Sequence, residues 1–286
     1  MSAGHFQVDD TAHLIKVLDL HTVGAFTYRA SSPRLHGRNN VFGGQVMAQA
    51  LRAASYTVDE DRFVHSLHAS FLREGRFDED ILLTVTPTRD GRSFSSRHVA
   101  AHQGGREIFT MQAAFHTDEG GVDFQSPSAM REPPPDDLDA PTTAGRGFSD
   151  AIQLVESSEP GGVGGRAGPA DRVHAWLRSR SALPRDRSLH ACVLAYMSDA
   201  RTGAAAGHYL RTELSSGEQR IMMTSLDHAM WFHRAARADA WIHVDTILRS
   251  MASSRSLVSG TMHDKSGVHL ASFSQELLTR QLASAR

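Results

Sequence analysis

The chain has 286 residues, with the 40% hydrophobic and 22% charged residues of a soluble globular protein, and this length suits two domains of ordinary size. The formal net charge of −2 argues against a general nucleic-acid binder, which would be strongly basic. Cys192 is the only cysteine, so we expect no internal disulfide and a reducing compartment.

The two ends of the chain and its hydropathy give no sign of export or membrane insertion. The N-terminus, M-S-A-G-H-F-Q-V-D-D, has neither the basic start nor the apolar core of a signal peptide. No apolar run approaches the ~20 residues that a membrane helix needs, and the final L-A-S-A-R matches no common address signal. We therefore expect a cytoplasmic protein with no membrane partner.

The first half of the chain is predicted to form one helix followed by four strands. Residues 45–55 carry apolar side chains at helical spacing. Four later segments alternate in polarity or are rich in β-branched residues; they are residues 63–73, 81–89, 93–103 and 106–116. Asp-Gly at 90–91 and Gly-Gly at 104–105 are hairpin signals between them.

A polar, turn-rich region then begins near Thr117. It includes E-P-P-P-D-D-L-D at 132–139 and S-S-E-P-G-G-V-G-G-R-A-G-P at 157–169, with a possible short strand at 151–156 between them. We interpret the first cluster as a linker and the second as a loop. The predicted organisation is an N-terminal domain at 1–118, a linker at 119–146 and a C-terminal domain at 147–286.

The second half repeats the same order of elements. A helix is predicted at 189–198, where the chain reads L-H-A-C-V-L-A-Y-M-S. Four strands are predicted after it, at 227–234, 241–250, 255–264 and 268–279. Short strings also recur: H-A-S-F-L-R at 68–73 resembles A-M-W-F-H-R at 229–234, and S-S-R ends at both Arg97 and Arg255. We therefore predict two units, each an apolar helix wrapped by an antiparallel meander.

Three strings give this repeat a resemblance to a known family. They are V-F-G-G-Q-V at 41–46, L-D-H-A-M-W-F-H-R at 226–234 and S-F-S-Q-E at 272–276, and the second is the most specific. With F-x-R at 71–73 and R-D-G-x-S-F-S at 89–95, the chain resembles the acyl-CoA thioesterase II family. The resemblance implies an α+β double hotdog fold, in which two tandem antiparallel sheets each curl around a central helix. It also implies hydrolysis of fatty acyl-CoA to free fatty acid and CoA, without a cofactor.

The resemblance further implies a catalytic trio of an aspartate, a hydroxyl residue and a glutamine. Residue by residue, these match Asp199 in Y-M-S-D, Ser225 in M-T-S-L-D-H and Gln275 in S-F-S-Q-E, with serine where the family more often has threonine. Aligning the two halves sets Ala54, Val64 and, to within a residue, Ala114 against these three positions. All three candidates are thus polar in one half only, which predicts one active site per chain.

Thioester hydrolysis needs an activated water, groups that position it and donors for the oxyanion. Asp199 would be the general base, and Ser225 and Gln275 would hold the water and the base in line. Gly43 and Gly44 would aim N–H groups from a helix start at the thioester carbonyl. The pattern places Asp199 near the C-terminal end of its helix, where a carboxylate is disfavoured by ~0.3–1 kcal/mol.

The phosphates of CoA need a local cationic cluster in a chain that is almost neutral. The repeated S-S-R predicts that Arg97 and Arg255 lie at the rim of the cleft and bind these phosphates, with Arg73 and Arg234 at matching strand ends. Taken singly, each is more often an ordinary solvated charge at a strand end.

Two other functions stay open from the sequence: a non-catalytic acyl-CoA-binding protein and an enoyl-thioester hydratase, although no convincing Asp/His pair supports the latter. Neither H-E-x-x-H nor paired cysteines occur, so we expect no metal site. No G-x-S-x-G motif occurs, which argues against an ordinary serine hydrolase. Because exposed sheet edges are usually covered by a partner, we expect a homodimer or homotetramer.

Overall fold

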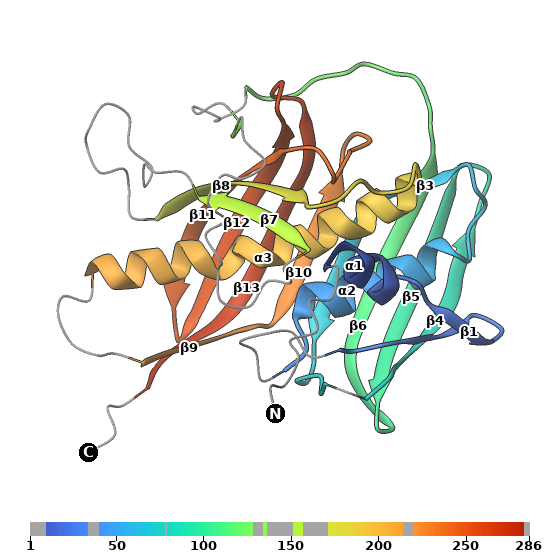
Figure 1. Ribbon diagram of the computed structural model, residues 1–286, viewed down its shortest axis with the longest axis horizontal. Helices are drawn as coiled ribbons and strands as arrows, with labels where there is room; N and C mark the ends of the chain where they lie inside the picture. The colour runs from blue at the N-terminus through green and yellow to red at the C-terminus, as the bar shows by residue number, and fades with distance from the viewer. Residues whose placement is uncertain are drawn as a thin grey trace, which may run out of the picture.

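A computed structural model describes residues 10–33, 40–77, 79–127, 134–135, 151–156, 171–213 and 220–282. It shows two halves side by side, each with a long helix lying against a curved sheet (Figure 1). Most of the predicted linker and the whole predicted loop at 157–169 lie outside the described residues.

The N-terminal half contains the helix and the four strands that the sequence predicts. These elements are α2 (Gly43–Ser55), β3 (Arg62–Phe71), β4 (Ile81–Asp90), β5 (Phe94–Gln103) and β6 (Arg106–Thr117). Three further elements precede them and were not predicted: α1 (Asp10–Val17), β1 (His21–Gly24) and β2 (Thr27–Ala30). Leu14 in α1 and Leu18 just after it are buried in the same core as the apolar side chains of α2, so the N-terminal segment completes this unit.

The C-terminal half also contains its predicted strands, including the short strand at 151–156. Its elements are β7 (Ile152–Glu156), β8 (Arg172–Ser179), α3 (Arg187–Glu213), β9 (Arg220–Ser225), β10 (Asp227–Phe232), β11 (Ile242–Ala252), β12 (Arg255–Asp264) and β13 (His269–Leu282). The predicted end of the helix at 198 is wrong, because α3 continues to Glu213. A-R-T-G-A-A-A-G is rich in alanine, and alanine favours helix strongly enough to continue it through two glycines.

The strand connectivity differs from the predicted meander. In the N-terminal half the order is β4-β5-β6-β3, so the first strand after the helix pairs with the last strand rather than with the second. The C-terminal half repeats this arrangement as β11-β12-β13-β10. The chain between β3 and β4 is long enough to carry β4 across the helix to the far side of β6, which a tight hairpin could not do.

One continuous antiparallel sheet unites the two halves. Strand β3 pairs with β10, with His68 opposite Ala229, so the edge of each half is covered by the other half. The helices also meet. Arg52 near the end of α2 bonds Asp186 and Ser188 at the start of α3, while Gly44 near the start of α2 bonds Asp199. The two helices therefore run antiparallel, side by side against the sheet.

Strand irregularities show that the two halves are structural repeats. The pairing of β4 with β5 shifts between Pro87 and Arg89, and the pairing of β11 with β12 shifts between Leu248 and Ser250. The pairing of β3 with β6 also matches that of β9 with β13. Val64 lies opposite Phe115 in the first pair, and Ser225 lies opposite Leu277 in the second. The predicted equivalence of Val64 with Ser225 is thus confirmed, and these pairings place Ala113, one residue from the predicted Ala114, at the position of Gln275.

Candidate active site

Asp199 lies in the middle of α3, where its carboxylate is buried with 7% of the residue exposed. The prediction that it ends a helix is therefore wrong. Its Oδ2 accepts a hydrogen bond of 2.7 Å from the backbone N–H of Gly44, in the first turn of α2 from the other half. The N-terminus of a helix carries a partial positive charge and unpaired N–H groups, so this is a favourable place for a carboxylate.

Gly43 and Gly44 allow the two helices to approach this closely. A Cβ on Gly43 would lie 2.8 Å from the Phe71 ring and 3.1 Å from Asp199 Oδ2, and one on Gly44 would lie 2.9 Å from the Tyr196 carbonyl oxygen. The glycine pair thus brings α2 to the carboxylate. Since the Gly44 N–H donates to Asp199, the expectation that both glycines offer their N–H groups to a thioester carbonyl is corrected for Gly44.

Gln275 and Ser225 complete a hydrogen-bonded cluster around Asp199. Gln275 is fully buried on the helix-facing side of β13. Its Nε2 donates to Asp199 Oδ1 at 2.8 Å and to Ser225 Oγ at 2.5 Å. The Ser225 hydroxyl, at the end of β9, can donate to the same Oδ1 at 3.4 Å. The structure therefore brings together the three predicted residues, from three different elements.

His228 belongs to this cluster and was not predicted to do so. Its Nδ1 lies 2.7 Å from Gln275 Oε1, and its Nε2 lies 2.9 Å from the Ser198 hydroxyl. Burial lowers the pKa of His228, which keeps the ring neutral. A signal was present in the sequence: within D-H-A-M-W-F, strand alternation puts His228 on the same buried face as Met230, where an imidazole needs partners.

Asp199 and Ser225 line a cleft of about 550 Å³, and Gly43 lies beside them in its wall. One part of the wall is polar and includes Asn40, Arg73 and Glu74. Small or apolar residues of α3, β9 and β13 line another part; they are Gly203, Ala204, Met223 and Leu277. A carboxylate thus lies beside an open space that has both polar and apolar walls.

The two arginines that were predicted to bind phosphate do not line this cleft. Arg97 is 3% exposed, and its guanidinium donates to Thr57, Arg89, Ser96 and Asp90. This contradicts a phosphate-binding role, because such contacts would have to be broken at the cost of a buried, unpaired charge.

Arg255 is half exposed on the outer face of the sheet and bonds Glu276 at 2.9 Å. The S-S-R echo is also out of structural register. Arg97 lies opposite Ala113 on the neighbouring strand, and Val258 lies opposite Gln275, the counterpart of Ala113. Val258, and not Arg255, therefore occupies the position of Arg97 in the other half.

Within the described ranges, no group of three or more His, Cys, Asp or Glu side chains is placed to hold a metal ion. No helix in that part of the chain is long and apolar enough to span a membrane. The cleft wall supplies a carboxylate, a hydroxyl and the start of a helix, and the buried Gln275 amide bonds the first two; this set is suited to activating and orienting water.

Two sheets that each wrap a helix and join edge to edge define a double hotdog protein. Family models describe the same division: residues 32–116 match an acyl-CoA thioesterase N-terminal domain, and residues 127–279 match an acyl-CoA thioesterase C-terminal domain. The chain belongs to the acyl-CoA thioesterase family, and specifically to the acyl-CoA thioesterase II family of thioester hydrolases.

Individual relatives agree with this assignment. The chain is 33% identical to human acyl-coenzyme A thioesterase 8 over 84% of this chain and 80% of the relative. It is 30% identical to acyl-CoA thioesterase 2 of Haemophilus influenzae over 94% of this chain and 97% of the relative. A crystal structure of an acyl-CoA thioesterase II from Mycobacterium marinum superposes with a TM-score of 0.80 at 35% identity, covering 96% of this chain and 99% of that chain.

Proposed function

We propose that this protein hydrolyses fatty acyl-CoA to free fatty acid and CoA, with Asp199 as the general base. The observation that carries the proposal is the cluster in which one amide group, Gln275 Nε2, donates to both Asp199 and Ser225 beside an open cleft. The names of the relatives support the substrate class.

In the proposed reaction Asp199 takes a proton from a water molecule, and the oxygen of that water attacks the thioester carbonyl carbon. Gln275 holds the carboxylate and the Ser225 hydroxyl in place, and Ser225, which lines the cleft, positions the water, so that an improbable encounter becomes a positioned one. The carbonyl oxygen becomes an oxyanion, for which we assign the N–H of Gly43, in the cleft wall at the start of α2. The C–S bond then breaks, and the protonated Asp199 returns its proton to the leaving CoA thiolate.

The two other functions differ in what the site must do. A non-catalytic acyl-CoA binder has no use for a buried carboxylate fixed by three donors. An enoyl-thioester hydratase would use a second acid or base facing the substrate, whereas His228 lies behind Gln275 and does not line the cleft. Both features favour hydrolysis.

The test replaces Asp199 by asparagine, which removes the basic oxygen and keeps the shape. We expect the rate of CoA release from acyl-CoA to fall by about 10²–10⁴-fold, as for a lost general base. Asp80→Asn is the matched control, because Asp80 is exposed and its ion pair with Arg29 spans 3.7 Å. CoA release can be followed with a thiol reagent, because Cys192 is buried.

If Asp199→Asn retained more than about a tenth of the wild-type rate while folding normally, Asp199 would not be the base. If the wild-type protein bound acyl-CoA without releasing CoA, the non-catalytic function would replace this one. Hydration of an enoyl-CoA by the wild-type protein, in the absence of hydrolysis, would favour the hydratase.

A further inference from the structure

The cleft beside Asp199 has an apolar arm that leads away from its polar wall. This arm is lined by Gly203, Ala204, Met223 and Leu277, none of which has a polar side chain. An alkyl chain placed there buries apolar surface and leaves no polar side chain of these four residues without a partner. The inference that follows rests on acyl-CoA as the substrate of the proposed function.

Helix α3 and strand β9 form two sides of the apolar arm. On α3, Asp199, Gly203 and Gly207 are four residues apart, so they follow one face of the helix. On β9, Ser225 and Met223 are two residues apart, so both point to the same side of the strand, toward α3. The catalytic pair thus lies at the start of the arm, and Gly203 and Met223 lie next along it.

The Met223 side chain closes the arm at its far end. Its terminal methyl group would lie 3.9 Å from a Cβ at Gly203 and 3.5 Å from a Cβ at Gly207, so it rests across the helix near both. Gly203 lines the cleft, whereas Gly207 is not among the described residues that do so. The cleft therefore stops at Met223, although the same face of α3 continues to Gly207.

Met223 has room to leave this position. It is 38% exposed although it points toward the helix, because β9 has β13 on one side and no described strand on the other. Methionine is unbranched and has three rotatable bonds. In the described part of the chain, the Met223 methyl is the one atom within 4 Å of a Cβ at Gly203, outside the backbone of α3. Rotation of Met223 would join the space above Gly203 to the surface at Gly207.

The dimensions of α3 indicate which acyl lengths Met223 separates. With a rise of about 1.5 Å per residue, Gly203 lies about 6 Å and Gly207 about 12 Å along the helix from Asp199. An extended alkyl chain advances about 1.3 Å per carbon, given C–C bonds of about 1.5 Å. An acyl group of about six carbons therefore reaches Met223, and one of about ten reaches Gly207 only after Met223 has moved.

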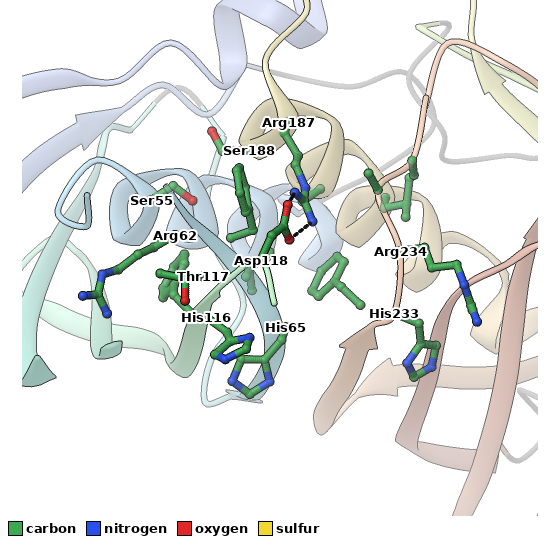
Figure 2. Close-up of a pocket in the computed structure, with 18 of the residues that line it drawn as sticks. Ser55, Arg62, His65, His116, Thr117, Asp118, Arg187, Ser188, His233 and Arg234 are labelled. Carbon is green, nitrogen blue, oxygen red and sulfur yellow. Dashed lines mark hydrogen bonds and ion pairs between the residues drawn. The ribbon is translucent and has the colours of Figure 1, made fainter. Parts of the chain in front are cut away.

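The N-terminal half has no such arm at the counterpart position. In the register of the repeat, Arg62 occupies the position of Met223. Figure 2 shows the pocket there, with the Arg62 guanidinium directed away from Arg187; it donates to the carbonyls of residues 91 and 92. Because α2 ends at Ser55, no equivalent of the second half of α3 continues the wall. The apolar arm thus belongs to the half that carries Asp199.

We propose that Met223 determines the length of the acyl chain that this protein accepts. The chain lies along α3 from Asp199 past Gly203. Met223 is the end wall for acyl groups of about six carbons, and its displacement admits acyl groups of about ten.

The test measures binding, so that it does not depend on turnover. S-hexyl-CoA and S-decyl-CoA are thioethers that cannot be hydrolysed, and each is titrated into the full-length chain by calorimetry. Met223→Ala removes the end wall and should lower the ratio of the Kd of S-decyl-CoA to that of S-hexyl-CoA at least ten-fold, because each buried methylene changes Kd by about four-fold. Met223→Trp, which fills the space toward Gly207, should raise this ratio at least ten-fold.

Met222→Ala is the matched control. Met222 is the neighbouring residue on β9 and is 36% exposed, and its side chain points away from α3. Gly203→Leu is a further variant that fills the arm before Met223, so it should raise the Kd of both thioethers. Leucine favours helix more than glycine does, and thermal melts check that this variant folds.

An unchanged ratio in both Met223 variants, or the same shift in Met222→Ala, would overturn the proposal. Wild-type Kd values in a folded Gly203→Leu would also overturn it, because the alkyl chain would then lie elsewhere. Length-dependent binding of the thioethers without CoA release from acyl-CoA would refute the proposed hydrolysis and support the role of Met223. CoA release with the same chain-length profile in wild type and both Met223 variants would refute only the role of Met223.

Discussion

Gln275 can serve the cluster in one orientation of its amide group, with Nε2 facing Asp199 and Ser225. His228 fixes that orientation, because Gln275 Oε1 accepts a hydrogen bond only if Nδ1 of the imidazole carries the proton. Burial lowers the pKa of His228, so the ring is neutral and has one proton to place. The Ser198 hydroxyl lies 2.9 Å from the other nitrogen and 2.9 Å from the carbonyl oxygen of Ala195, so its single proton has two competing acceptors. His228 is thus a positioning residue that acts through Gln275.

Substitution of His228 should lower kcat and leave KM for acyl-CoA nearly unchanged. His228→Leu removes the donor, so we expect a loss in kcat on the order of 10²-fold, comparable to other small misplacements of catalytic groups. His228→Asn keeps a donor near the position of Nδ1 and should recover part of that loss. Steady-state kinetics of both variants, with thermal melts as controls, checks this.

Equal activity of His228→Asn and His228→Leu at equal stability would show that the donor is unimportant. A rise in KM with kcat unchanged would place His228 in substrate binding instead.

How much of the site the sequence could predict differs from residue to residue. Asp199, Ser225 and Gln275 were available from the family resemblance, and their apolar counterparts supported them. The hydrogen bond from Gly44 to Asp199 could not be predicted, because it joins two residues far apart in the sequence. They lie on two helices, and no local sequence pattern encodes how these helices pack. The predicted phosphate-binding role of Arg97 was wrong for a local reason. Arg97 and Val99 are two residues apart, so both side chains lie on the buried face of β5, whereas Arg255 lies on the exposed face of β12.

At the scale of elements, the contact between α2 and α3 depends on the absence of a side chain at Gly44. A Cβ there would lie 2.6 Å from the Phe42 ring and 2.9 Å from the Tyr196 carbonyl oxygen. The Tyr196 oxygen belongs to the α3 backbone, so it cannot move without moving that helix. The position of Asp199 relative to α2 is set by this contact.

Gly44→Ala should therefore destabilise the fold and impair catalysis together. Overpacking of this kind costs about 1–3 kcal/mol, which denaturant unfolding can measure, and the displaced helix should lower kcat. Gly120→Ala is the matched control, because a Cβ at Gly120 would meet nothing within 4 Å. Wild-type stability in Gly44→Ala would mean that the two helices are less closely packed than this contact indicates.

A second consequence at this scale concerns acid stability. His243 on β11 lies opposite His263 on β12, and burial followed by neighbouring histidines lowers the pKa of each to about 4. An unfolded histidine has a pKa of about 6.5. The unfolded chain therefore binds more protons between these values, and the stability that the neutral rings contribute is lost as pH falls from about 6.5 toward 4.

The melting temperature should fall steadily across that window, before most carboxylates titrate. Each histidine contributes a slope of at most about 1.4 kcal/mol per pH unit to the free energy of unfolding. His243→Gln and His263→Gln should flatten the curve, and His208→Gln, on α3 and half-exposed, should not. A melting temperature independent of pH between 6.5 and 4.5 would contradict the assignment.

The elements themselves were largely predictable, because alternation and turn residues are local signals. β3 to β6 and β10 to β13 all lie where the sequence places them. The order of the strands in the sheet could not be predicted from these signals. A meander and the observed arrangement contain the same strands and differ only in which strands pair with each other. α3 was predicted too short. Its second half buries Ala205 and Ala206 against Leu248, Val258 and Leu277 of the sheet, and this tertiary packing continues the helix beyond the predicted end.

For the whole molecule, the joined sheet changes the reason to expect oligomers. The inner edge strands of the two halves, β3 and β10, pair with each other. These two edges are therefore covered within one chain and need no partner subunit. Large apolar side chains instead remain exposed at outward-facing strand positions; they include Leu82, Phe94, Trp231 and Leu257. A sheet face with such residues favours a partner.

We predict a homodimer formed through this outer face. Light scattering at micromolar concentration should give twice the 31.2 kDa of one chain, and Trp231→Lys, which adds a charge to the face, should shift the mass toward that of one chain. A mass of one chain for the wild-type protein would contradict the prediction, and an unaltered dimer in Trp231→Lys would place the interface elsewhere.

The hydrogen bond from Gly44 to Asp199 also has a consequence for the time course of folding. Gly44 precedes Asp199 by 155 residues, and Gln275 follows Asp199 by a further 76. Contacts of such sequence separation require large loops to close and form slowly, whereas each helix and hairpin can form from local contacts. A chain emerging from the ribosome therefore lacks the cluster of Asp199, Ser225 and Gln275 until its last strand is made. In refolding, secondary structure should return first, and turnover should appear only when the two halves have docked.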